Sequence, residues 1–219
     1  MRIFLKNLAN NAKQGSLADR LRQKRFRLFL SLIHELPRPI KIIDVGGTGL
    51  FWERMGFTGQ PGVSITLINL KPSAVDYEGF TFVTGDALDL KQFGDQEFDI
   101  AFSNSVIEHV GSFGDQQKMA AEMMRVAKKI FLQTPNYYFP LEPHFLFPFF
   151  QFFPLWLQAS LLQYFNLGWY NKVPDRKKAI QICLSVRLLK KSELKRLFPG
   201  ARFYEEKFFG LVKSFIVLK

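Results

Sequence analysis

Residues 40–52, Ile-Lys-Ile-Ile-Asp-Val-Gly-Gly-Thr-Gly-Leu-Phe-Trp, constrain the fold of this chain more than any other stretch. A run of β-branched residues reaches an acid, Asp44, and a glycine-rich turn follows at once. This order is typical of a buried parallel strand whose carboxyl end delivers the chain to a nucleotide-like ligand. Glycines in such a turn permit positive φ and let the backbone approach the ligand closely, while the acid fixes the loop or accepts hydrogen bonds from it.

The composition is that of a folded chain of one domain. It has 219 residues, 47% of them apolar, which is enough for a sizeable core. The one cysteine, Cys183, excludes an internal disulfide and a CxxC metal site and suits a reducing compartment. With only three histidines, we expect no metal site. The first residues lack the apolar core of a secretory signal, so we expect a cytoplasmic protein.

The formal net charge of +11 narrows the range of partners. Such an excess suits a nucleic acid, an anionic membrane surface or an acidic substrate, and says nothing about the fold. Solvated helix faces explain it equally well. The basic clusters are Arg20, Arg22, Lys24, Arg25 and Arg27, and Lys172, Arg176, Lys177, Lys178, Lys190, Lys191, Lys195 and Arg196.

Predicted strands alternate with predicted helices along the chain. The expected strands are 40–45, 64–70, 80–87, 98–104, 129–134, 201–207 and 212–218; the expected helices are 17–35, 50–57, 115–127 and 191–198. This order predicts an α/β fold, a Rossmann-like, doubly wound, seven-stranded and mostly parallel sheet with helices on both faces and a C-terminal antiparallel hairpin. We expect one domain over 1–219, with a basic helical extension at 1–39 and an aromatic cap insertion at 137–172.

The first and last helices carry boundary signals. Ser16 and Ser192 are the expected N-caps, and Pro199-Gly200 ends the last helix. The residues expected to face inward from the first helix are Leu17, Leu21, Leu28, Leu32 and Ile33.

Polar residues stand where several of these strands end. Ligands of parallel sheets bind beyond the carboxyl ends of the strands, so these residues should converge on one crevice. Turn chemistry alone explains any single one of them, because Asp and Asn favour turns. The residues are Asp44, Asn69, Asp86 and Ser103-Asn104.

Four segments together resemble the class I S-adenosylmethionine-dependent methyltransferases, in particular the small-molecule branch often labelled type 11. They are Ile-Ile-Asp-Val-Gly-Gly-Thr-Gly, Thr-Gly-Asp-Ala, Phe-Asp-Ile-Ala-Phe-Ser-Asn-Ser-Val-Ile-Glu-His-Val and Leu-Gln-Thr-Pro-Asn. The resemblance covers residues 40–219 and implies S-adenosylmethionine as cofactor. An NAD-type fold fits less well, because it requires Gly-x-Gly-x-x-Gly and an acid about 20 residues further on.

The resemblance implies a role for each residue of the glycine loop. Asp44, Gly46, Gly47 and Thr48 would shape the loop around the methionine part of the cofactor. Asn69 stands where the family usually has an acid for the ribose hydroxyls. The loop also departs from the family pattern Asp-x-Gly-x-Gly-x-Gly, because Thr and Leu occupy the last two glycine positions. Both departures would weaken cofactor binding, since an amide makes a weaker, uncharged hydrogen bond.

The remaining cofactor residues lie further along the chain. Asp86 would accept a hydrogen bond from the adenine amino group, with the backbone amide of Ala87 near the ring. Ser103 and Asn104 would line the methionine end, close to the sulfonium.

Two histidines are the candidate catalytic bases, needed only if the acceptor is a protonated nucleophile such as a hydroxyl. His109 has an unperturbed pKa of about 6.5, but it equally suits a helix-start residue packed under the cofactor loop. His144, with Glu142, is the second candidate, and the alternative there is a rigid proline-bracketed turn. Glu108 is expected to orient the loop.

Segment 137–172 is rich in aromatic residues and carries no charge from Phe145 to Asn171. Its length suits a membrane span. Its glutamines and prolines argue against one, and so does its position in the chain between the fifth strand and the last helix of the predicted sheet. We expect a cap that keeps an acceptor pocket dry, with peripheral contact to an anionic membrane as an addition. Either suggests a bulky or lipid-linked acceptor.

These features predict a methyltransferase acting on a small-molecule, glycan or lipid-linked acceptor, with oxygen as the expected methylated atom. A nucleic-acid (RNA) methyltransferase is the first alternative, motivated by the net charge, although the chain has no appended RNA module and no Asn-Pro-Pro-Tyr signature. A non-catalytic scaffold of the same fold at a membrane surface is the second, motivated by the altered loop and Asn69.

Overall fold

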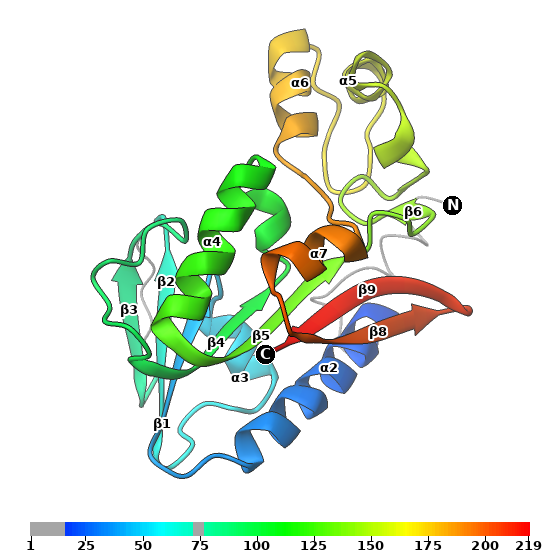
Figure 1. The fold of residues 1–219 in the computed structure, drawn as a ribbon. Coiled ribbons are helices and arrows are strands. Elements are labelled where there is room, and N and C mark those ends of the chain that lie inside the picture. Colours follow the sequence, from blue (N-terminus) through cyan, green and yellow to red (C-terminus); the bar gives the residue numbers. More distant parts are fainter. Residues whose placement is uncertain (1–15, 72–76) are drawn as a thin grey trace.

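A seven-stranded sheet organises the part of the chain that the computed structural model describes, residues 16–71 and 77–219 (Figure 1). The strand order is β3-β2-β1-β4-β5-β9-β8. The strands are β1 Ile40–Val45, β2 Val63–Asn69, β3 Phe80–Thr84, β4 Phe98–Asn104, β5 Ala127–Pro135, β8 Arg202–Phe208 and β9 Leu211–Leu218. The first five are parallel, and β9 joins β5 in the antiparallel sense. The predicted fold class is confirmed.

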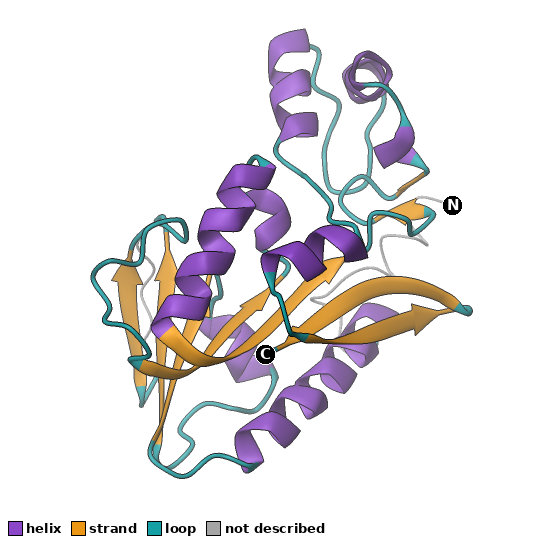
Figure 2. Ribbon diagram, viewed as in Figure 1, coloured by secondary structure: helices purple, strands orange, loops and turns teal. Residues whose placement is uncertain are grey.

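Helices cover both faces of the sheet, as Figure 2 shows. The helices beside the sheet are α2 Leu17–His34, α3 Gly49–Arg54, the 3-10 turn η1 Ile107–His109, α4 Phe113–Val126 and α7 Lys191–Leu197. Alternate residues of β1 serve the two faces, because side chains of a strand point to opposite sides. Ile42 packs under α2 and α3, whereas Ile43 packs under α4 and α7.

An aromatic core lies between α2 and the sheet. Phe29 of α2 packs edge-on against Phe102 of β4, with ring centroids 4.9 Å apart, and Phe102 stacks on Phe131 of β5 at 5.3 Å. Phe26 and Ile33 are also buried, and Leu28 and Leu32 pack against the same core, so the predicted inward face of α2 is confirmed at Leu28, Leu32 and Ile33. The spacing of Phe26, Phe29 and Ile33 is also helical, and the rings of Phe26 and Phe29 both contact the ring of Trp52 edge to face.

The ends of two helices test the boundary predictions. The Ser16 hydroxyl accepts a hydrogen bond from the Asp19 amide at 3.0 Å, so the first N-cap is confirmed. The prediction of Ser192 as the last N-cap is wrong, because α7 already begins at Lys191 with Lys190 as N-cap. The Glu193 carboxylate accepts the Lys190 amide at 2.9 Å and fixes this earlier start. Residues 1–15 of the predicted basic extension lie outside the described residues.

The region after β5 forms a separate lobe at the carboxyl end of the parallel strands, above the sheet in Figure 1. It comprises β6 Leu141–Glu142, β7 Phe147–Pro148, η2 Phe150–Phe152, α5 Leu155–Tyr164 and α6 Arg176–Leu184. We call this lobe, residues 137–188, the cap. It has its own small core, which includes Phe145, Phe150 and Leu162 and also Ala179 of α6, beyond the predicted boundary at 172. Among the described residues, no helix is long and apolar enough to cross a membrane.

Candidate functional site

The glycine loop after β1 is built around the carboxylate of Asp44. This side chain is fully buried, and its Oδ2 atom accepts a hydrogen bond from the indole nitrogen of Trp52 at 2.7 Å. A Cβ atom at Gly47 would lie 1.6 Å from Oδ2, so only glycine fits over the carboxylate. Gly46 has a φ of +81°, and its missing Cβ would lie 2.6 Å from Val106. The loop therefore needs both glycines, one for space and the other for space and backbone conformation.

Burial raises the pKa of Asp44 to about 7, although the hydrogen bond from Trp52 opposes the shift. Its second oxygen, Oδ1, is buried with no hydrogen-bond partner among the described residues. A buried, unpartnered carboxylate oxygen at the wall of a cavity is a ready acceptor for a ligand's N–H groups.

We expect Asp44→Asn to flatten the pH dependence of stability. The folded-state pKa of Asp44 lies above its unfolded value of about 3.8. The unfolded chain therefore releases this proton first, and the wild-type free energy of unfolding falls as pH rises from about 4 to about 7. Between pH 5 and 8 the loss is about 3 kcal/mol, at 1.36 kcal/mol per pKa unit.

Urea unfolding of both proteins at pH 5 and pH 8 measures this difference. The variant should lose about 3 kcal/mol less than the wild type over this interval. Equal losses in the two proteins would mean that Asp44 titrates normally.

Asn69 at the end of β2 is tied to the same loop. Its side-chain amide donates to the carbonyl oxygen of Gly47 at 2.5 Å. An acid at this position would present a carboxylate to that carbonyl, so the amide here holds the loop where a carboxylate would repel it. The Oδ1 atom of Asn69 is then the acceptor that this residue offers to a ligand.

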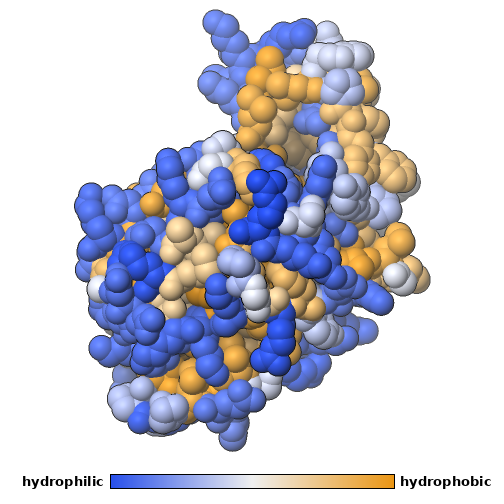
Figure 3. Space-filling view, in the orientation of Figure 1, coloured by the Kyte–Doolittle hydropathy of each residue, from blue (hydrophilic) through white to orange (hydrophobic). Residues whose placement is uncertain are grey.

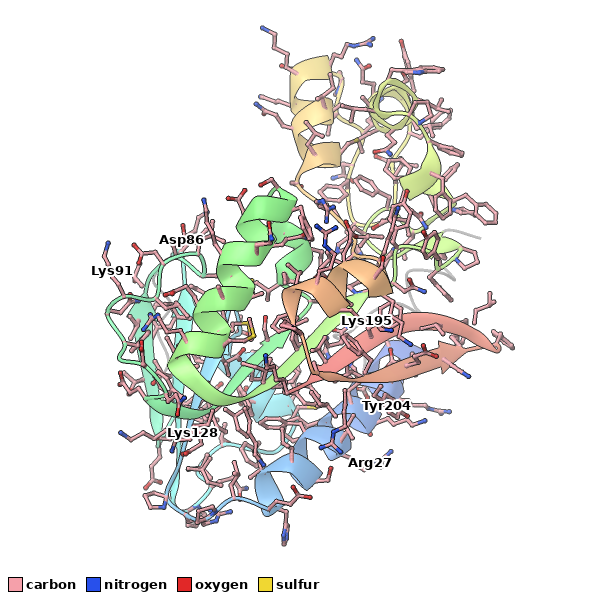
Figure 4. The ribbon with its side chains drawn as sticks, viewed as in Figure 1. Arg27, Asp86, Lys91, Lys128, Lys195 and Tyr204 are labelled. Carbon is pink, nitrogen blue, oxygen red and sulfur yellow. The ribbon has the colours of Figure 1, made fainter. Side chains whose placement is uncertain are left out.

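A cavity of about 700 Å³ lies beyond the ends of β1, β2 and β3. We call it the cofactor cavity. Its walls include Gly46, Asn69, Asp86, Ala87 and His109. Figure 4 shows Asp86 at the same end of the sheet as the cap. One carboxylate oxygen of Asp86 accepts the Leu88 amide at 2.9 Å, which fixes the turn, and the side chain is exposed.

A smaller cavity of about 260 Å³ lies on the other side of the glycine loop. It shares Gly46 and Thr48 with the cofactor cavity and is also lined by Asp44, Gly47 and Asn104. Ser103 lines neither cavity. It is buried within the sheet, and its hydroxyl donates to the Val45 carbonyl at 3.0 Å, which ties β4 to β1 below the loop.

A third cavity, of about 250 Å³ and mainly apolar, lies between the cap and the sheet. We call it the cap cavity. His144, Trp169 and Phe208 line it, together with Ser105, which also lines the cofactor cavity. Ser105 therefore lines both cavities, and we call the region around it, where the walls of the two cavities adjoin, the junction.

The two histidines singled out in the sequence lie together at this junction. His109 lines the cofactor cavity and His144 lines the cap cavity, and their rings contact edge to face with centroids 4.7 Å apart. The Nδ1 atom of His144 lies 2.7 Å from Glu142, whose other oxygen accepts the backbone amides of His144 and Phe145. Glu142 thus fixes the imidazole of His144 from behind.

The environments of the two rings push their pKa values apart. Burial and the neighbouring His144 lower the pKa of His109. Burial also acts to lower the pKa of His144, but the hydrogen bond to Glu142 and the charges of Glu142 and Glu108 outweigh it, so that pKa is raised.

Glu108 completes the group. It is fully buried on η1, its Oε2 atom accepts the Thr134 hydroxyl at 3.0 Å, and its Oε1 atom has no partner among the described residues. Burial raises its pKa to about 7. From the sequence, Glu108 was expected only to orient the loop, and the Glu-His pair after a strand was the sole signal for it. Thr134 and Ser105 lie in two of the segments that carry the family resemblance, but neither was predicted as a site residue.

Comparisons with known proteins bear on the fold. Residues 43–130 match the model of a methyltransferase domain. The carbon methyltransferase of CurJ superposes with a TM-score of 0.61 at 13% identity, covering 96% of this chain and 56% of that one. The chain has the fold of a class I S-adenosylmethionine-dependent methyltransferase.

A second solved structure and two related sequences are also similar to this chain. The N-terminal domain of EvdMO1, solved with S-adenosylhomocysteine (SAH) and D-fucose, has a TM-score of 0.54 at 16% identity and covers 90% of this chain and 81% of that one. Uncharacterised proteins from two strains of Mycobacterium tuberculosis are 36% identical over 54 residues. That match spans 25% of this chain and 18% of theirs.

Proposed function

We propose that this protein transfers the methyl group of S-adenosylmethionine to a hydroxyl oxygen of an acceptor bound under the cap. The observation that carries the proposal is the junction of the cofactor cavity and the cap cavity at Ser105, with His109 on one side and His144 on the other. A methyl donor and an acceptor held in these two cavities would meet beside the histidine pair.

The residues of the cofactor cavity fit an adenosyl group. Asp86 and Ala87 stand at the end of β3, where they would bind the adenine, and the Oδ1 atom of Asn69 offers an acceptor for a ribose hydroxyl. A Cβ atom fits at neither Gly46 nor Gly47. Asp44, whose Oδ1 atom has no partner among the described residues, lines the smaller cavity, on the side of the loop where the methionine part would lie. Neither Thr48 nor Asn69 blocks the cavity, since both lie in its wall.

When bound, S-adenosylmethionine supplies an electrophilic methyl group, and most of the catalysis is then positioning. A hydroxyl acceptor must also lose its proton. The side chains placed to accept it are His109 and His144, with Glu142 holding His144 in orientation. The mainly apolar cap cavity excludes water from the acceptor side.

Isothermal titration of SAH into the purified protein tests the proposed function. The wild type should bind one SAH, and Asp86→Ala should lose at least about tenfold in affinity, since a hydrogen bond to a charged group contributes about 1.5–3 kcal/mol. Asp95→Ala is the matched control, because Asp95 pairs with Arg125 outside the cavities and should leave binding unchanged. If a folded wild type binds no SAH, the methyltransferase proposal fails and the non-catalytic scaffold replaces it.

We further propose that the acceptor is lipid-linked and that the cap rests on a membrane surface. Several large apolar side chains of the cap are exposed, including Trp156 (61%), Tyr164 (73%) and Phe165 (59%). Figure 3 shows apolar side chains gathered over the cap. The basic residues Lys172 and Arg176 follow them in the chain and are also exposed. Aromatic rings beside basic side chains suit the headgroup layer of an anionic membrane.

Co-sedimentation with vesicles checks this surface. We expect Trp156→Ser/Phe165→Ser to bind anionic phospholipid vesicles several-fold more weakly than the wild type. Leu70→Ser is the control, because Leu70 is 73% exposed but follows β2 in the sheet and is not part of the cap. Equal vesicle binding by the wild type and the double variant would refute the membrane contact, and the proposed acceptor would then be a molecule that is not attached to lipid.

A further inference from the structure

Three metal-ligating side chains gather at the junction of the two cavities. Glu108 and His109 come from η1, and His144 comes from the turn between β6 and β7. Each offers one ligand atom, and these atoms all lie within 4.8 Å of one another. Two imidazoles and one carboxylate are a donor set that Zn²⁺, Fe²⁺, Mn²⁺ and Co²⁺ accept readily.

Each of the three side chains is held by a second contact that leaves one atom for coordination. The Nδ1 atom of His144 is bonded to Glu142 at 2.7 Å, and Nδ1 of His109 lies 3.4 Å from the Ser185 carbonyl oxygen. With Nδ1–H donated to these acceptors, each ring presents the lone pair of Nε2. A carboxylate or carbonyl behind the imidazole is the usual support of a metal-binding histidine.

Glu108 supplies the independent sign of a missing ligand. Its Oε2 atom is occupied by the Thr134 hydroxyl, but the fully buried Oε1 atom has no partner in the part of the chain that is described. An unpaired buried carboxylate oxygen is costly, and a bound cation removes that cost.

We propose that Glu108, His109 and His144 bind one divalent first-row transition-metal ion at the junction of the cofactor cavity and the cap cavity. No metal site was expected from the sequence, because the chain has only three histidines. The fold brings two of them, 35 residues apart in sequence, together beside a buried acid. This inference rests on the proposed function for its role: the ion would bind the acceptor hydroxyl and lower the pKa of that hydroxyl. With the ion bound, His109 and His144 serve as its ligands and not as bases, so the hydroxyl loses its proton to solvent. The new O–CH₃ bond then forms as the S–CH₃ bond of the cofactor breaks, and SAH leaves.

Titration with Co²⁺ tests the site directly, because Co²⁺ bound to imidazole gives visible absorption without any turnover. The wild type, freed of metal by dialysis against a chelator, should bind one Co²⁺ per chain. His109→Gln, His144→Gln and Glu108→Gln should each weaken binding at least about tenfold. His34→Ala controls for the third histidine, which is exposed on α2, and Cys183→Ser controls for the one thiol; both should bind Co²⁺ as the wild type does.

Failure of the metal site can be distinguished from failure of the proposed function. SAH titration in the same metal-free preparations should still show binding, because the cofactor cavity does not depend on the ion. If SAH binds but Co²⁺ does not, or if the three variants bind Co²⁺ as tightly as the wild type, the metal site is refuted while the methyltransferase proposal stands. Should Glu108→Gln fail to fold, Glu142→Gln replaces it, with a loss of about 10- to 100-fold in Co²⁺ affinity expected from the freed His144 ring.

Discussion

Replacing Gly47 by alanine is expected to abolish SAH binding and to lower the free energy of unfolding by about 3 kcal/mol or more. The added Cβ atom would lie 1.6 Å from the Oδ2 atom of Asp44. Neither neighbour can yield, because Asp44 is fully buried and bonded to Trp52, which is itself fully buried among the aromatic rings under α2. The loop must therefore move away from the cofactor cavity.

Urea unfolding and SAH titration measure the two effects of Gly47→Ala separately. Gly94→Ala is the control, since that glycine is exposed, does not have a positive φ and has only the Glu97 carboxylate 3.7 Å from an added Cβ. A Gly47→Ala protein that binds SAH with wild-type affinity would show that the loop does not contact the cofactor.

Replacing Arg25 by methionine should lower the free energy of unfolding by about 3–5 kcal/mol. Arg25 of α2 reaches across to β8, where its Nη1 atom lies 3.0 and 3.3 Å from the two oxygens of Glu206. Both side chains are at least nine-tenths buried. Removing the cation leaves Glu206 in the interior with the Ser214 hydroxyl and, at 3.5 Å, Lys213. Breaking one half of a buried pair costs more than the pair itself contributes.

Thermal and urea unfolding of Arg25→Met measure this cost. Arg27→Met on the same helix is the matched control, because Arg27 is exposed and projects away from the sheet in Figure 4. A loss below about 1 kcal/mol in Arg25→Met would mean that Lys213 takes over the pairing. Arg25 and Lys213 are engaged inside the protein and are not available to a nucleic acid. These two basic residues therefore do not support the alternative of a nucleic-acid methyltransferase.

The sheet was predictable from the sequence because its strands carry their own signal. Ile40–Val45 and Phe98–Asn104 are mostly apolar and are buried at nearly every position on both faces, and their predicted bounds are confirmed to the residue. The strand from Phe80 ended earlier than expected, at Thr84, since the polar turn around Asp86 follows at once.

The cap helices were not predictable from pattern. Leu155–Tyr164 is apolar on nearly every side, with Leu162 inside and Trp156 outside, so no helical period separates the two faces. Arg176–Leu184 is short, and its buried residues, Ala179 and Cys183, are small. These two helices depend on packing against each other, and a local residue pattern does not contain that contact.

Some residues of the candidate site were also predictable from the sequence, and others were not. Residues at strand ends, such as Asp44 and Asn69, were placed by the topology that the strands impose, and they do lie at cavity walls. The approach of His144 to His109 depends on the turn held by Glu142, which no spacing in the sequence encodes. The unpartnered oxygen of Glu108 depends on how η1 packs beneath the cap, which the sequence pattern does not predict.

The most direct test of the account is a crystal structure of the protein with SAH. We predict one SAH in the cofactor cavity, its adenine beside Asp86 and Ala87, its ribose beside Asn69 and its sulfur on the side of Ser105 and His109. A folded protein whose crystals show SAH outside this cavity, with the Gly46-Gly47 loop free of contact, would contradict the account.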